Sequence, residues 1–107
     1  MSIFKRYIDA MNSADVNQMS ELFAEDAVFD DSANASTGRP PLYLEGREEI
    51  EKMFTGFLKR KPVAKLIGIK ENKMDYDVAL GDLVLPCRAT FIMTKDGKIQ
   101  RLEARAR

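Results

Sequence analysis

The hydrophobic repeat of this chain changes at Pro62, and this change is the strongest constraint on its fold. Before Pro62, apolar residues recur mainly at helical spacing; after it, apolar and polar residues alternate in segments joined by turns. Helices that precede a run of turn-linked strands indicate an α+β fold. We therefore expect N-terminal helices packed on a curved antiparallel sheet.

Three amphipathic helices are predicted before Pro62. The first covers residues 2–12 and places four apolar side chains on one face: Phe4, Tyr7, Ile8 and Met11. The second begins at a capping box of Asp15 and Gln18, and its apolar face holds Val16, Met19, Leu22 and Phe23. The third has glutamates in its first turn and basic residues in its last, ends before Pro62, and carries Ile50, Met53, Phe54, Phe57 and Leu58 on one face.

The remaining segments predict strands and one long loop. A short strand at 27–29 leads to the pair Asp30-Asp31, and residues 32–46 are rich in Ser, Gly, Pro and Asn, which indicates a loop. The strands expected after Pro62 are 63–70, 74–80, 83–94 and 99–106. Pro86 lies in the middle of the third of these, which favours an edge position or a bulge there.

Composition excludes several functions. The chain has 107 residues, which fits one domain over residues 1–107. Its 17 basic and 17 acidic residues balance, which argues against nucleic acid as a partner. It has no histidine, no glycine-rich phosphate loop and no clustered metal-ligand spacing, so we expect no cofactor and no bound metal. No apolar run reaches membrane-spanning length, and the single cysteine, Cys87, fits a reducing compartment; we expect a cytoplasmic protein without a membrane partner.

Two side chains are candidates for chemistry, and each has a simpler interpretation. Tyr7 lies on the apolar face of the first helix, where it is either an ordinary core residue or a phenol that faces a ligand. Asp31 either ends a strand in solvent or carries a carboxylate into a cavity. Adjacent strand residues point to opposite faces, so at most one of Asp30 and Asp31 enters such a cavity.

Three segments carry a family resemblance: Arg6-Tyr7 with Asn12, the run Leu22–Val28 leading to Asp31, and Gly46–Ile50. Together they resemble the cone-shaped α+β domain of the nuclear-transport-factor-2-like superfamily, which includes SnoaL-like proteins. The first half is most similar to steroid Δ-isomerases, because Tyr7 and Asp31 fall without a gap where those enzymes carry their oxyanion-hole tyrosine and catalytic base. The resemblance implies that Asp31 removes a proton α to a carbonyl and that Tyr7 stabilises the enolate.

The chain departs from those isomerases at the second acid of the oxyanion hole. Its position falls on Arg88 when the alignment is anchored on Pro86, and on Ala89 when it is anchored on the Asp96-Gly97 turn. Loss of one such donor typically slows catalysis about 100-fold or more.

Two functions therefore stay open. One is a SnoaL-like protein that binds a small apolar carbonyl compound and transfers a proton α to its carbonyl. The alternative is a non-catalytic ligand-binding or dimerisation module. Superfamily members are commonly homodimers, so the resemblance also implies a homodimer that pairs through the convex face of the sheet.

Overall fold

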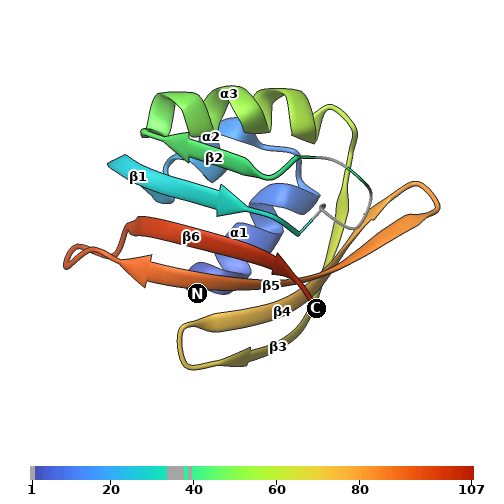
Figure 1. Ribbon diagram of the computed structural model, residues 1–107. Coiled ribbons are helices and arrows are strands. Elements are labelled where there is room, and N and C mark those ends of the chain that lie inside the picture. Colours follow the sequence, from blue (N-terminus) through green and yellow to red (C-terminus); the bar gives the residue numbers. More distant parts are fainter. Residues whose placement is uncertain (1, 34–37, 39) are drawn as a thin grey trace.

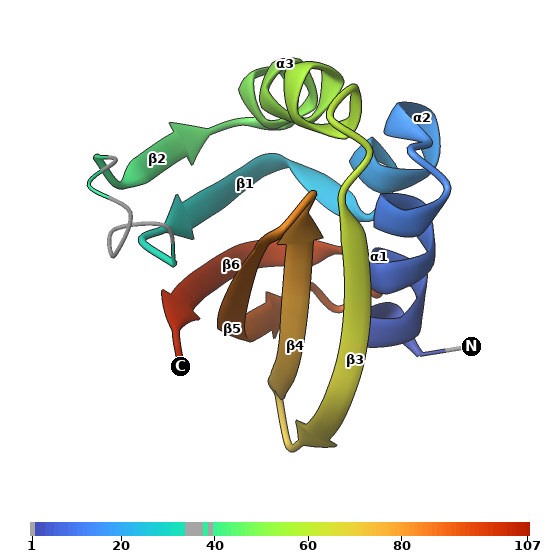
Figure 2. The ribbon, with the colours of Figure 1, turned by 90° about the vertical axis from the view of Figure 1, so that its right-hand side faces the viewer.

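The computed structural model describes residues 2–33, 38 and 40–107, and over these residues it contains three helices and one six-stranded sheet (Figure 1). The helices are α1 (Ile3–Asn12), α2 (Val16–Ser20) and α3 (Arg47–Leu58). The strands are β1 (Phe23–Asp31), β2 (Leu42–Glu45), β3 (Val63–Lys70), β4 (Lys73–Leu80), β5 (Leu83–Met93) and β6 (Ile99–Ala106). The helices lie against the inner side of a strongly curved sheet (Figure 2), so the predicted α+β class is confirmed. No helix in these described ranges is long and apolar enough to cross a membrane.

The sheet has the strand order β2-β1-β6-β5-β4-β3 and is mixed rather than purely antiparallel. Every neighbouring pair is antiparallel except β1 and β6, which run parallel with Val28 opposite Arg101 and Asp31 opposite Ala104. A parallel pair needs a long connection, and the segment between β1 and β6 includes α3 and all the other strands. Local periodicity carries no information on such a distant pairing.

The second helix is shorter than predicted and the first strand is longer. Leu22 and Phe23 lie beyond α2, which ends at Ser20, and Phe23 is the first residue of β1. The Leu22 carbonyl accepts a hydrogen bond from the Ile99 N–H at 2.8 Å, so pairing with the distant β6 overrides the helical spacing. The β1–β6 register also shifts between Phe23 and Val28, which disturbs the alternation that would have revealed the whole strand.

The predicted loop at 32–46 contains the strand β2. Leu42–Glu45 pairs antiparallel with β1, with Leu42 opposite Asp31 and Glu45 opposite Val28. The loop prediction is wrong for these residues, because a four-residue strand that follows Pro40-Pro41 gives too short an alternation to recognise. Residues 34–37 and 39 of the predicted loop lie outside the described residues.

Pro86 is not on an edge strand, contrary to the expectation. Its strand β5 lies between β4 and β6, and the register of β5 against β4 runs without a shift through Pro86, opposite Asp77. The proline is tolerated because β6 ends beside it: Ala106 is opposite Cys87, and Arg107 N–H donates to the Pro86 carbonyl at 3.0 Å. The missing proline N–H therefore falls where the neighbouring strand stops.

The side-chain amide of Asn12 joins the end of α1 to the start of β3. Its Nδ2 donates to the Ala64 carbonyl at 2.9 Å, and its Oδ1 accepts from the Ala64 N–H at 2.7 Å. Since β3 is the last strand of the sheet, the Asn12 amide takes the place of a further strand at this point. This contact fixes α1 across the open edge of the sheet and thereby positions Tyr7 on its inner face.

We expect Asn12→Ala to lower the free energy of unfolding by about 2 kcal/mol, because it removes two hydrogen bonds of about 1 kcal/mol each. Urea denaturation followed by circular dichroism measures this loss. The matched control is Asn17→Ala on α2, an exposed position where we expect a change within about 0.5 kcal/mol. Equal losses in the two variants would show that the Asn12 amide does not hold β3.

Candidate active site

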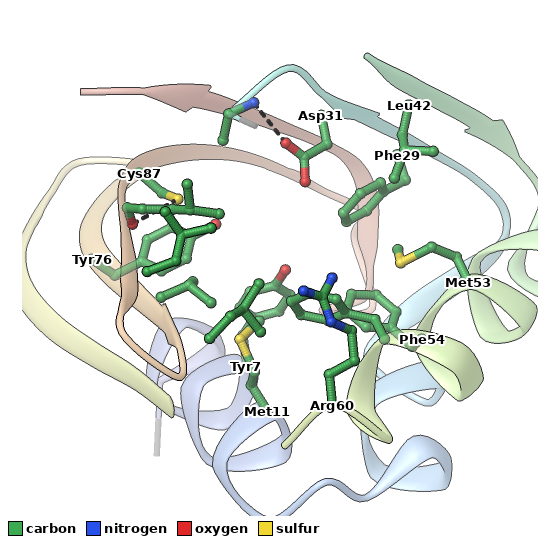
Figure 3. Close-up of a pocket in the computed structure, with 16 residues that line it drawn as sticks. Tyr7, Met11, Phe29, Asp31, Leu42, Met53, Phe54, Arg60, Tyr76 and Cys87 are labelled. Atoms are coloured by element: carbon green, nitrogen blue, oxygen red, sulfur yellow. Dashed lines mark hydrogen bonds between the residues drawn. The ribbon is translucent and has the colours of Figure 1, made fainter. Parts of the chain in front are cut away.

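A cavity of about 370 Å³ lies between the inner face of the sheet and the helices α1 and α3 (Figure 3). This volume is near the lower end of the range for small-molecule sites. Most of the lining is apolar: Met11, Phe29, Ala33, Leu42, Met53, Phe54, Phe57, Val78, Leu80, Leu83 and Leu85. The remaining lining side chains are Tyr7, Asp31, Arg60, Tyr76 and Cys87. An apolar wall with a few polar groups is the usual composition of a ligand site.

Tyr7 is positioned by α1 and held by aromatic neighbours. It is 2% exposed, and its ring lies edge-on to those of Phe54, Tyr76 and Phe91 at centroid distances of 6.3, 6.3 and 5.5 Å. Its hydroxyl faces the cavity in Figure 3. Burial, together with the nearby negative charge of Asp31, raises the pKa of Tyr7 far above its ordinary value. The phenol therefore stays protonated and is able to donate a hydrogen bond.

Asp31 ends β1 and brings a carboxylate to the opposite side of the cavity. Its Oδ1 accepts the Ala33 N–H at 2.8 Å, and its other oxygen faces the cavity (Figure 3). Burial raises the pKa of Asp31, and the Ala33 hydrogen bond and the Arg105 charge oppose this rise only in part. A carboxylate with a raised pKa is a stronger base than an exposed one.

Asp30, the neighbouring carboxylate, lies on the other face of the sheet. Its Oδ2 accepts hydrogen bonds from Arg101 at 3.1 Å and from Arg105 at 3.0 Å. The alternation of strand residues thus separates the two acids, as expected from the sequence. The structure brings Tyr7 and Asp31 to one cavity, and their catalytic roles stay predictions.

Tyr76 and Cys87 are cavity residues that the sequence did not single out as a site. They are directly opposite each other on β4 and β5. Tyr76 is 3% exposed, and its ring lies edge-on to that of Tyr7, with centroids 6.3 Å apart. Burial raises the pKa of the Cys87 thiol to about 12, so it stays protonated, and it donates to the Leu85 carbonyl at 3.4 Å. One sequence signal could have identified Tyr76: it occupies an inward-facing position of its strand among apolar residues. A phenol at such a position is buried and needs a polar partner.

Arg60 reaches the cavity from the turn after α3. The sequence predicted it in the last turn of the helix, but α3 ends at Leu58. Its side chain lines the cavity, and the residue is exposed (Figure 3). The cavity is therefore bordered by a cation at its solvent-accessible side.

Neither candidate for the second acid contributes a carboxylic acid. Ala89 is fully buried on the inner face of β5. Arg88 points outward, where its Nε donates to Asp75 Oδ1 at 2.7 Å. Within the described part of the cavity wall, Asp31 is the single carboxylate. The second acid that steroid Δ-isomerases carry is therefore missing from this cavity wall as well as from the aligned sequence.

The comparisons with known proteins agree with this architecture. The chain matches the SnoaL-like domain family over residues 4–102, and no curated protein matches significantly. Similar solved structures include the epoxide hydrolase/cyclase-like enzyme SalBIII, studied for pyran ring formation in the polyether salinomycin (TM-score 0.81, 16% identity, 98% of this chain and 88% of that chain). A second is an NTF2-like protein of unknown function from Cytophaga hutchinsonii (TM-score 0.77, 16% identity, 98% of this chain and 87% of that chain). A third is a candidate ketosteroid isomerase from Kribbella flavida (TM-score 0.73, 16% identity, 98% of this chain and 75% of that chain). At this identity the likeness establishes the fold alone.

The adjacent acids Asp30 and Asp31 are expected to have opposite effects on stability. Asp31→Asn keeps the acceptor for the Ala33 N–H and removes a half-buried charge, so it should stabilise the fold near neutral pH. Because the folded pKa of Asp31 is raised, its ionisation costs stability as pH rises above the ordinary carboxyl range. The gain should therefore be larger at about pH 7 than at about pH 4.

Asp30→Asn is the matched variant, and it should lower the free energy of unfolding by about 1 kcal/mol because it weakens two partly exposed ion pairs. Urea unfolding of both variants at the two pH values measures the difference. If Asp31→Asn destabilised the protein near neutral pH as much as Asp30→Asn, the carboxylate of Asp31 would not be under a burial penalty.

Proposed function

The chain belongs to the SnoaL-like domain family, and from this premise we propose that its cavity binds a small, largely apolar carbonyl compound and transfers a proton at the carbon α to the carbonyl. One observation carries the proposal: a largely apolar cavity holds a carboxylate and a neutral phenol that face it from different elements. The carboxylate is Asp31 at the end of β1, and the phenol is Tyr7 on α1.

The proposed reaction begins with the ligand's carbonyl oxygen accepting a hydrogen bond from the Tyr7 hydroxyl. Asp31 takes the α-proton, the C–H electron pair forms a carbon–carbon double bond, and the carbonyl π pair moves to the oxygen. The Tyr7 hydrogen bond stabilises the negative oxygen as it forms. Asp31 then returns the proton to another carbon of the enolate, so the product is an isomer and the carboxylate is regenerated.

The electrostatics of the cavity suit these roles. Burial raises the pKa of Asp31 and so increases its strength as a base. Burial also raises the pKa of Tyr7, which keeps the phenol a donor rather than a competing base. Two of the similar structures are described as cyclase-like and isomerase-like enzymes. Since one fold hosts several reactions, the proposal rests on the cavity residues and not on those descriptions.

The decisive assay is conversion of β,γ-unsaturated ketones to conjugated enones, followed by ultraviolet absorbance. Cyclohex-3-enone and a β,γ-unsaturated ketosteroid cover a small and a large substrate. We expect Asp31→Asn to lower the rate by at least about 100-fold, the lower end for loss of a general base. Asp30→Asn, one residue away on the opposite face, should retain the wild-type rate. A wild-type rate in Asp31→Asn would exclude Asp31 as the base.

A second candidate function is a non-catalytic ligand-binding module. The observation that favours it is that neither Arg88 nor Ala89, the two positions at which the resemblance places the second acid, brings a carboxylic acid to the cavity. Under this alternative, wild type and Asp31→Asn bind an apolar fluorescent probe equally well, and neither converts the ketones.

We also propose that two copies of the chain pair through the outer face of the sheet. Val63, Ala79 and Val84 are neighbours across β3, β4 and β5, and the two valines are 61% and 54% exposed. Exposed apolar side chains that gather in one patch commonly mark an interface.

We also propose a cytoplasmic location, because the only thiol, Cys87, is buried and unpaired, which fits a reducing compartment.

Light scattering at micromolar concentration tests this pairing. We expect the mass of a dimer for the wild type and that of a monomer for Val84→Asp, because the substitution places an unpaired charge inside the apolar patch. The control is Asn17→Asp on α2, which adds a charge away from the sheet and should leave the dimer intact. A monomeric wild type would contradict the proposal.

A further inference from the structure

We propose that Arg60 binds a carboxylate group of the ligand at the solvent-accessible side of the cavity, so that the compound taken by this site is an apolar keto acid rather than a neutral ketone. This inference rests on the proposed function and deepens it, because it names the class of carbonyl compound that the same cavity binds. Neither the resemblance nor the proposed reaction gives Arg60 a role.

The open side of the cavity, which we call the mouth, is lined by Arg60 and Leu83. Among the described lining residues, these two are exposed, and Leu80 on the same hairpin as Leu83 is half-buried. Residues that line the inner part, such as Tyr7 and Val78, are buried. A bound compound therefore contacts apolar side chains over most of its length and meets solvent beside Arg60 (Figure 3).

Backbone hydrogen bonds at the end of α3 hold Arg60 in this position. The Arg60 N–H donates to the Phe57 carbonyl at 3.0 Å, and the Lys61 N–H donates to the Leu58 carbonyl at 3.0 Å. Lys61 has a φ of 52°, the left-handed conformation that commonly ends a helix. Leu58 is 2% exposed and fixes the turn to the core. The main chain of Arg60 is therefore held at the mouth by the fold itself.

The charge of Arg60 is left available for a ligand. Arg88 on β5 pairs with Asp75 at 2.7 Å, and both arginines of β6 pair with Asp30. Over the residues that the structure describes, Arg60 forms no such ion pair, not even with Asp31, which lines the same cavity. A guanidinium stays charged, and its planar donors match the two oxygens of a carboxylate. An unpaired guanidinium beside an apolar cavity therefore indicates an anionic group on the bound compound.

The other charges of the cavity indicate what kind of anion this is. The described lining holds one cation, Arg60, and one carboxylate, Asp31. Asp31 would repel an anion placed beside it, and a charge buried among apolar side chains without a partner is costly, so the anionic group belongs at the mouth. A phosphate carries nearly two charges at neutral pH, more than one guanidinium neutralises. A carboxylate, with one charge, matches Arg60.

The test compares two probes that differ in charge and hardly in size. 4-Benzoylbutyrate is an aryl ketone with a carboxylate, and its primary amide is the neutral counterpart. Isothermal titration calorimetry at about pH 7 measures the binding of each probe. Arg60→Gln removes the positive charge, whereas Arg60→Lys keeps the charge without the planar fork. The matched control is Lys59→Gln, which removes one positive charge from the adjacent exposed residue that does not line the cavity.

We expect the wild type to bind the carboxylate about tenfold more tightly than the amide, near the lower end for a hydrogen bond to a charged group. Arg60→Gln should weaken carboxylate binding about tenfold and leave amide binding unchanged, and Arg60→Lys should retain part of the preference. Lys59→Gln should bind both probes like the wild type. The preference should fall as salt is added, because salt screens an exposed ion pair.

Four results would overturn the inference. One is carboxylate binding that is unchanged in Arg60→Gln, and another is no binding of either probe to the wild type. An equal loss for both probes would mean that Arg60 acts through packing of its alkyl chain and not through its charge. An equal loss in Lys59→Gln would mean a general effect of surface charge rather than a site. Thermal unfolding checks that each variant is folded.

The outcome is separate from that of the ketone assay. If no ketone is converted but Arg60→Gln loses the preference for the carboxylate, proton transfer by Asp31 fails and the binding role of Arg60 stands. If ketones are converted and Arg60→Gln binds the carboxylate like the wild type, the proposed function stands and the inference fails.

Discussion

The parallel pairing of β1 with β6 is the contact on which the site depends. It places Asp31 opposite Ala104, and the Ser32 N–H extends the pairing by donating to the Ala104 carbonyl at 2.9 Å. Through β6, the end of β1 is connected to β5 and then to β4. Without this pairing, the carboxylate of Asp31 would not share a cavity with the phenols of Tyr7 and Tyr76. The candidate residues thus come together through the pairing of two strands, β1 and β6, that are far apart in the sequence.

The two sides of β1 give adjacent carboxylates different environments. Asp30 binds two arginines of β6 at the solvent-facing side, where ion pairs contribute modestly. Asp31 faces an apolar cavity, where burial favours its neutral form and raises its pKa. A strand with one face toward solvent and the other toward an apolar cavity can therefore give two adjacent carboxylates different pKa values. Burial at the same cavity raises the pKa of both phenols and keeps them neutral.

Local patterns predicted most of the architecture correctly. The bounds of β3 and β6 were predicted to the residue, and those of α1, β4 and β5 to within one residue, because amphipathic spacing and tight turns are local properties. The errors share one cause. Phe23 joins β1 rather than α2, Leu42–Glu45 pairs with β1, and Pro86 lies inside the sheet where β6 happens to end. Each depends on a strand that is distant in the sequence.

The sequence by itself determined the α+β class and the inward face of each main element, since these follow from periodicity. The resemblance to steroid Δ-isomerases then made Tyr7 and Asp31 the candidate pair. Only the tertiary structure decided that both residues line one cavity, that Asp30 forms ion pairs on the opposite face, and that the ring of Tyr76 contacts that of Tyr7. The physical reason is that a contact between buried rings on α1 and β4 requires the packing of the whole core. No local pattern records which distant side chain a buried residue will contact.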